Sequence, residues 1–140
     1  MNDFSKEIKN RIKNNSKNDN LKKASFNFLK KSFPEKYCYN FSWLGRPIIQ
    51  YPHDIIAIQE IIWKVKPDLI IETGIAHGGS VIFSSSMLAL LELADKNTLK
   101  KNQKQNYIKR KVVAIDIDIR KHNLKEIKKH PFYSNIQLIE

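Results

Sequence analysis

The 140-residue sequence predicts an α/β fold with a parallel sheet, in which helices and strands alternate. Two short apolar runs, at 69–71 and 112–115, are long enough for a buried strand and too short for a helix. A glycine-rich turn follows the first run, and an apolar segment at 81–94 follows the turn. A strand, a glycine turn and a helix in this order are typical of the ligand-side turn of a βαβ unit.

The N-terminal third predicts less regular structure. Residues 1–24 are rich in Lys and Asn and predict a flexible arm or a loose helix. Apolar side chains between Phe26 and Phe33 predict a short element that docks on the main body. Residues 37–51 are aromatic-rich and contain Gly45 and Pro47, so we interpret them as an ordered loop. Their rings either build a pocket wall or cap the core.

The remaining elements follow in order. Apolar residues at helical spacing predict a helix from Pro52 to near Pro67. We then expect a strand at 68–72, a helix at about 79–94, a strand at 112–115, an amphipathic helix at 123–129 and a strand at 135–139.

The net charge of +11 is concentrated in two polar segments. Residues 1–36 hold 10 Lys/Arg and 4 Asp/Glu, and residues 96–111 hold 7 Lys/Arg and no acid. We therefore predict a basic, partly flexible arm at 1–36 and a main domain at 37–140 with a basic surface insertion at 95–111. Both segments are also rich in Asn, which favours a solvated or membrane-attracted patch over a specific nucleic-acid surface.

The sequence also predicts a cytoplasmic protein. No stretch reaches the ~18–20 apolar residues of a transmembrane span, and the N-terminus has no apolar signal core. The single cysteine, Cys38, suits a reducing compartment.

The glycine turn carries the candidate ligand-binding residues. Glu72 ends the first strand, and Gly74, Gly78 and Ser80 follow in a pattern that is neither G-x-G-x-x-G nor a P-loop. Glu72 would repel a pyrophosphate but attract a cationic group, and the following helix N-terminus attracts a carboxylate by ~0.3–1 kcal/mol. The pattern therefore favours S-adenosylmethionine over NAD or ATP. We expect the Ser80 hydroxyl to cap the helix or to contact this cofactor.

Asp116 ends the second strand, where an acid accepts hydrogen bonds from ribose hydroxyls in dinucleotide-type folds. It follows Gly74 by 42 residues, against about 20 in the usual pattern. The long helix and the basic insertion account for the excess. The alternative is that Asp116, Asp118 or both only end a strand.

A combination of short motifs runs through the main domain: Trp43-Leu-Gly-Arg-Pro47, Gln50-Tyr-Pro-His-Asp54, Gln59-Glu60, Lys66-Pro-Asp-Leu-Ile-Ile-Glu-Thr-Gly74, His77-Gly-Gly-Ser80 and Val113-Ala-Ile-Asp-Ile-Asp118. Over about residues 41–140 it resembles the cephalosporin hydroxylase/rhamnosyl O-methyltransferase family. The resemblance implies a Rossmann-like, S-adenosylmethionine-dependent methyltransferase of carbohydrate or lipid biosynthesis, acting on a hydroxyl of a sugar or secondary metabolite. By position, it implies a methionine-side turn of Glu72, Gly74, Gly78 and Ser80, a ribose contact at Asp116, and a pocket border of Gln50, Tyr51 and Asp54.

The hydroxylase in the family name finds no support in the residues. An iron-dependent oxygenase needs two His and a carboxylate on one face of the metal, and the four histidines show no H-x-D pairing. We predict no metal ligand in this chain. The resemblance implies further strands, four to seven, that carry the substrate pocket, the general base and the acids of any divalent-metal site.

The sequence ends at Glu140, with the third predicted strand. We therefore expect a truncated or split member, inactive alone, with its catalytic residues unassigned. The edge of strand 68–72 would be unpaired, which favours self-association or pairing with a missing C-terminal half. The leading hypothesis is the cofactor-binding half of an O-methyltransferase. The alternatives are a non-catalytic module that binds a protein partner through its open edge or basic arm, and a basic nucleic-acid-associated protein.

Overall fold

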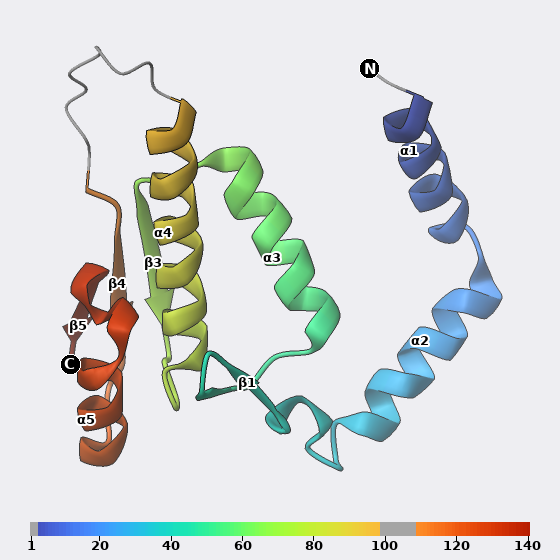
Figure 1. Ribbon diagram of the computed structural model, residues 1–140. Coiled ribbons are helices and arrows are strands. Elements are labelled where there is room, and N and C mark those ends of the chain that lie inside the picture. Colours follow the sequence, from blue (N-terminus) through green and yellow to red (C-terminus); the bar gives the residue numbers. More distant parts are fainter. Residues whose placement is uncertain (1–2, 99–108) are drawn as a thin grey trace. The chain divides into compact units, whose positions relative to one another are not determined.

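The computed structural model describes residues 3–98 and 109–140 (Figure 1). By its internal contacts the chain divides into two compact units, Met1–Tyr37 and Cys38–Glu140. Each unit is described by itself.

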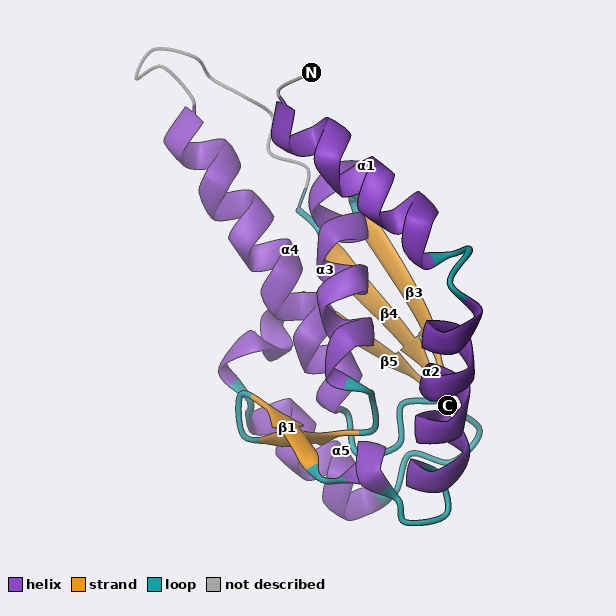
Figure 2. Ribbon diagram, turned by 90° about the vertical axis from the view of Figure 1, so that its right-hand side faces the viewer, coloured by secondary structure: helices purple, strands orange, loops and turns teal. Residues whose placement is uncertain are grey.

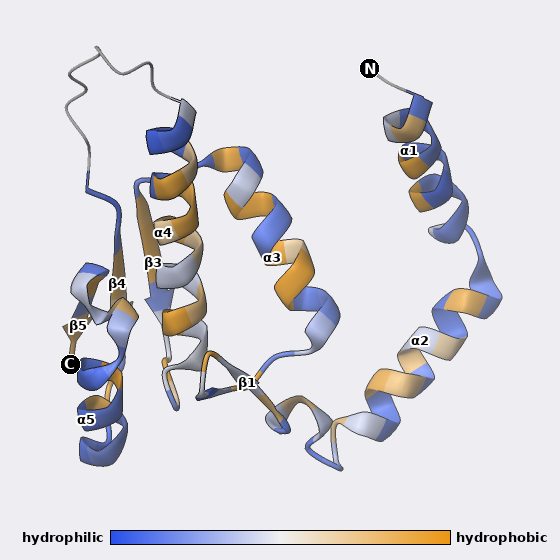
Figure 3. Cartoon of the chain, viewed as in Figure 1, coloured by the Kyte–Doolittle hydropathy of each residue, from blue (hydrophilic) through white to orange (hydrophobic). Residues whose placement is uncertain are grey.

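The first unit consists of two helices, α1 (Asp3–Asn15) and α2 (Asp19–Ser32). Of the two predicted alternatives for this segment, the helix is found. Asn18 begins α2 as its N-cap, because its side-chain oxygen accepts the Leu21 N–H at 3.0 Å. Neither helix is apolar all round, and orange and blue residues alternate along both in Figure 3. No residue of α1 is buried.

A short turn of 3-10 helix, η1 (Tyr37–Tyr39), spans the boundary of the two units, and a β-hairpin follows in the second unit. Strand β1 (Phe41–Trp43) pairs antiparallel with β2 (Arg46–Ile48). The expectation of a loop without regular structure is wrong for these strands. Leu44 and Gly45 both have positive φ, +46° and +84°, as the two central residues of a type I′ hairpin turn require.

The main sheet confirms the predicted parallel α/β class. Its elements are α3 (Pro52–Val65), β3 (Leu69–Thr73), α4 (Gly79–Thr98), β4 (Lys111–Ile115), α5 (Lys121–Lys129), a 3-10 segment η2 (Pro131–Asn135) and β5 (Ile136–Ile139). The strands run parallel in the order β3-β4-β5 (Figure 2). The helices begin or end within a few residues of the predicted bounds.

One face of the sheet packs against α4 and forms the core. The register places Ile70 beside Val112 and Val112 beside Ile136, all on this inner face. Leu88 and Leu91 of α4 are buried in the same cluster. Full burial of one such side chain stabilises the fold by roughly 1.5–3 kcal/mol. The opposite face is largely exposed, as the alternating burial of β3 shows.

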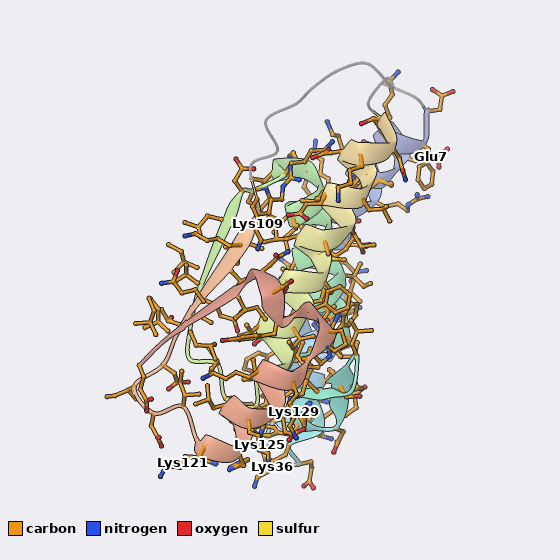
Figure 4. The ribbon with its side chains drawn as sticks, turned by 60° about the vertical axis from the view of Figure 1, so that its left-hand side comes forward. Glu7, Lys36, Lys109, Lys121, Lys125 and Lys129 are labelled. Atoms are coloured by element: carbon orange, nitrogen blue, oxygen red, sulfur yellow. The ribbon has the colours of Figure 1, made fainter. Side chains whose placement is uncertain are left out.

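Helix α5 is amphipathic, as predicted. Lys121, Lys125 and Lys129 follow one another along its outer side (Figure 4). Asn123 and Ile127 are the buried residues of this helix. The spacing of the lysines, four residues apart, places them on one face of the helix, and the opposite side is free to pack against the glycine turn.

The predicted basic insertion at 95–111 has two described ends, and its residues 99–108 lie outside the described part of the chain. Its first end belongs to α4, which runs to Thr98. Its second end contains Arg110, whose side chain is only 11% exposed. The Arg110 guanidinium lies 2.8 Å from the Asp95 carboxylate and donates to the Pro67 carbonyl at 3.2 Å. This arginine therefore belongs to the packed body.

Candidate functional site

The turn between β3 and α4 has three positive φ angles. They occur at Gly74 (+76°), Ala76 (+46°) and Gly78 (+83°). Gly74 has open space where a Cβ atom would lie, so its positive φ alone explains why glycine occupies this position. Its N–H donates to the Ile115 carbonyl at 2.8 Å and so ties the turn to β4. A second bond, from Gly78 N–H to the Ile75 carbonyl at 2.7 Å, closes the turn on itself.

Glu72 lies on the inner face of β3 and points toward α4. Its carboxylate accepts hydrogen bonds from the hydroxyls of Ser80 and Ser84, both on α4. Burial raises the pKa of the Glu72 carboxyl above its ordinary value, and the two serine hydroxyls lower it by a smaller amount. The charged form of this carboxylate is therefore poorly solvated, and a nearby cation would stabilise it.

Asp116 follows the end of β4, at the carboxyl edge of the sheet. Its Oδ2 atom accepts the Ile75 N–H at 2.7 Å and its Oδ1 atom accepts the Asp118 N–H at 3.2 Å. These bonds, first that from Ile75, lower the pKa of the Asp116 carboxyl. Asp116 thus holds the glycine turn against β4, a role that the sequence did not indicate. Each carboxylate oxygen has a further lone pair with which it can accept a hydrogen bond.

Two cavities lie along the turn and share a wall. The first, about 340 Å³, is lined by Glu72, Gly74, Ser80 and Gln50 among others. The second, about 410 Å³, is lined by Asp116, Asp118, Arg120, Asn123 and Tyr39 among others. Ile49, Ala76 and His77 line both. A single elongated ligand that follows the turn would meet the half-buried Glu72 carboxylate at one end and two aspartates at the other.

A comparison with protein families decides the relationship of the chain. A family model described as Rhamnosyl O-methyltransferase/CmcI matches residues 35–140.

The chain belongs to the rhamnosyl O-methyltransferase/CmcI family.

The family recognised in the sequence and its Rossmann-like fold are thereby confirmed. Neither the comparison with curated proteins nor that with solved structures gave a match. The range matched to the rhamnosyl O-methyltransferase/CmcI family begins after α2 and includes the hairpin, the glycine turn and both cavities.

In this rhamnosyl O-methyltransferase/CmcI family member, the structure brings only some of the sequence-predicted site residues together. Gln50 lines the same cavity as Glu72. Tyr51 and Asp54 are not among the described residues that line either cavity. Tyr51 is the N-cap of α3 with its ring 5.5 Å from that of His53, and Asp54 lies 3.5 Å from the same histidine. Gly78 packs against Ile127 of α5.

Sequence reasoning missed the side chains that support the turn. Arg46 donates from Nε and Nη2 to the His77 carbonyl at 3.1 and 2.5 Å, and from Nη2 to Asn123 Oδ1 at 3.2 Å. Asn123 in turn donates to the Ala76 carbonyl at 3.0 Å. Arg46 lies in one of the motifs that carry the family resemblance, so it could have been singled out. Nothing near Asn123 in the sequence marks it.

Two further searches of the described residues concern metals and membranes. Within residues 3–98 and 109–140, no group of three or more His, Cys, Asp or Glu is placed to hold a metal ion. In the same residues, no helix has the length and apolar content needed to cross a membrane.

Proposed function

We propose that residues 38–140 form the S-adenosylmethionine-binding part of an O-methyltransferase that acts on a hydroxyl of a sugar or secondary metabolite. One observation carries the proposal: the half-buried Glu72 carboxylate lies at the wall of a cavity beside a positive-φ glycine turn. Family membership supports the type of reaction.

The residues along the turn fit this cofactor. The Glu72 carboxylate would hold a cationic group, the ammonium or the sulfonium of S-adenosylmethionine. Asp116 and Asp118 line the adjoining cavity and offer acceptors for ribose hydroxyls. The bound cofactor would supply a methyl group made electrophilic by its positively charged sulfur. The residues of this chain would bind and orient it.

The same residues disfavour NAD and ATP. A pyrophosphate or triphosphate beside Glu72 would place like charges together in a partly buried site, where Coulomb repulsion is screened less than in water. We assign cofactor binding to the described residues and no catalytic base to any of them. We further propose a cytoplasmic location, which the single cysteine, buried and free, supports.

Calorimetric titration of the 140-residue chain with S-adenosylmethionine tests the proposal. We expect saturable binding, and no binding of ATP or NAD. Glu72→Gln should weaken the affinity by about tenfold or more, because it removes a charged hydrogen-bonding partner. Glu126→Gln is the matched control, since Glu126 is an exposed carboxylate of α5 that lines neither cavity among the described residues. A well-folded chain that binds no S-adenosylmethionine would refute the proposal.

A second candidate function is a non-catalytic module that binds a protein partner through its sheet. Among the described residues, β3 pairs with β4 alone. The uncovered face of the sheet exposes Leu69 (44%), Ile71 (62%) and Ile139 (40%). An apolar edge strand of this kind is a site for pairing with another chain.

Light scattering coupled to size exclusion tests this candidate for self-association. Ile71→Lys should abolish a concentration-dependent increase in mass, whereas Ile56→Lys on α3, where the isoleucine is 61% exposed, should not. Two results together argue against the candidate. The parent has the monomer mass at every concentration, and it retains no partner protein that the Ile71→Lys variant loses.

A further inference from the structure

Two side chains from distant parts of the sequence hold the glycine turn. Arg46 comes from β2, 31 residues before His77, and Asn123 comes from α5, 47 residues after Ala76. Four hydrogen bonds are involved. Arg46 donates two to the His77 carbonyl and one to Asn123, and Asn123 donates one to the Ala76 carbonyl.

These carbonyls lie where the turn adopts an uncommon backbone conformation. Ala76 has a φ of +46°, in the left-handed region that non-glycine residues rarely occupy. In a trans peptide the C=O and N–H groups point in opposite directions. A hydrogen bond that fixes the Ala76 or His77 carbonyl therefore also fixes the direction of the next N–H. The Gly78 N–H, directed in this way, donates to the Ile75 carbonyl at 2.7 Å.

The hairpin reaches the turn at a second point, beside Arg46. A side chain at Gly79 would overlap the Pro47 carbonyl and the Ile48 backbone, so β2 lies directly against the first residue of α4. Arg46 is half-buried, and none of the ion pairs among the described residues includes it. Its guanidinium donates instead to the His77 carbonyl and to the Asn123 amide oxygen.

We propose that Arg46 and Asn123 are positioning residues, which hold the turn at 74–79 in its cofactor-binding conformation without contributing a contact to the reacting atoms. This inference rests on the proposed function and adds a cause for the affinity. Without the two side chains, the turn populates its binding conformation for a smaller fraction of the time. The apparent dissociation constant rises by the inverse of that fraction.

Arg46→Ala removes three of the four hydrogen bonds, and we expect it to weaken S-adenosylmethionine binding by about ten- to a hundredfold. Arg46→Lys keeps the charge but offers no planar fork of donors, so its affinity for S-adenosylmethionine should lie between those of Arg46→Ala and the parent. Asn123→Asp keeps the acceptor for Arg46 and loses the donor to the Ala76 carbonyl. It should weaken binding by less than Arg46→Ala. Lys125→Ala, on the outer side of α5, is the control that should bind as the parent does.

Hydrogen exchange of the ligand-free chain is the readout that a general structural role would not reproduce. The amides of Gly74, Ile75 and Gly78 are hydrogen-bonded in the turn. In Arg46→Ala they should exchange faster while amides of β4 keep the protection of the parent. Millimolar guanidinium chloride, far below denaturing concentrations, should restore part of the lost affinity in Arg46→Ala and have no effect on Lys125→Ala.

The outcomes separate this inference from the proposed function. A parent chain that binds no S-adenosylmethionine refutes the function, and the exchange experiment still tests the turn. A parent that binds, with an Arg46→Ala variant that binds equally and exchanges equally, refutes the positioning role. Faster exchange throughout residues 38–140 also overturns it, because the arginine would then stabilise the whole unit. If Arg46→Ala does not fold, Arg46→Lys and Asn123→Asp decide by the same two measurements.

Discussion

Gly79 is the position where the structure makes the sharpest prediction about stability. It is the first residue of α4, where the gain in helix propensity from alanine is at most that of a helix interior, about 1 kcal/mol. Here the added methyl group would overlap the Pro47 carbonyl and the Ile48 backbone. These are backbone atoms, which can move away only if the whole hairpin shifts. We therefore place the overpacking cost at the upper end of its usual range, about 3 kcal/mol.

The difference between the two effects gives the expected result. Gly79→Ala should destabilise the chain by about 2–3 kcal/mol, which lowers the Tm by ~8–12 °C for a chain of this size. Thermal unfolding followed by circular dichroism measures this shift. It should be accompanied by weaker S-adenosylmethionine binding, because the hairpin and the turn move apart.

Gly45→Ala is the matched control. Gly45 has a φ of +84° and nothing within 4 Å of the point where a Cβ atom would lie, so only its backbone conformation opposes alanine. The cost there is about 1–2 kcal/mol, and the turn at 74–79 should keep its ligand affinity. A Gly79→Ala chain as stable as the parent, or more stable, would show that helix propensity dominates and that β2 does not lie against α4 as described.

Three further predictions concern the site and its support. Glu72→Gln should stabilise the ligand-free chain at neutral pH. Burial raises the folded-state pKa of Glu72, so the parent loses stability as pH rises from the ordinary pKa of a glutamate through the raised pKa. Thermal melts of the variant should lack this decline. Asp116→Asn should remove stability at neutral pH that the parent loses only as pH falls through the lowered pKa of Asp116. Urea unfolding at several pH values measures this difference. Trp43→Phe removes a 3.0 Å hydrogen bond to a serine hydroxyl of α4 and should cost about 1–2 kcal/mol in urea unfolding, whereas Trp63→Phe, at a half-exposed ring, should change stability by less than about 0.5 kcal/mol.

The parts of the fold that the sequence predicted are those encoded locally. The apolar runs around Ile70 and Val112, the glycines between them and the acids at 72 and 116 identify a parallel βαβ unit because each depends on neighbours within a few residues. The hairpin at 41–48 was missed because its turn begins at Leu44, a residue that rarely adopts a positive φ. The cue of Gly45 alone did not distinguish a hairpin from an irregular loop.

The remaining features of the site depend on contacts between distant residues. Arg46 meets the turn 31 residues later in the sequence, and Asn123 meets Arg46 across 77 residues. Periodicity and motif spacing carry no information on such pairs. The hold of Asp116 on the glycine turn was missed for the same reason, since its bond to the Ile75 N–H forms only when the two strands pair.

Arg110 explains how the long separation between Gly74 and Asp116 is compatible with one site. Its backbone N–H donates to Glu92 at 3.1 Å, and its side chain binds Asp95 and the Pro67 carbonyl. The end of α4 and the start of β4 are thereby fastened together before the chain enters the sheet. These contacts, and not the length of the connection, then set the distance between the end of α4 and the start of β4. The number of residues between Thr98 and Lys109 therefore does not decide where Asp116 lies relative to the glycine turn.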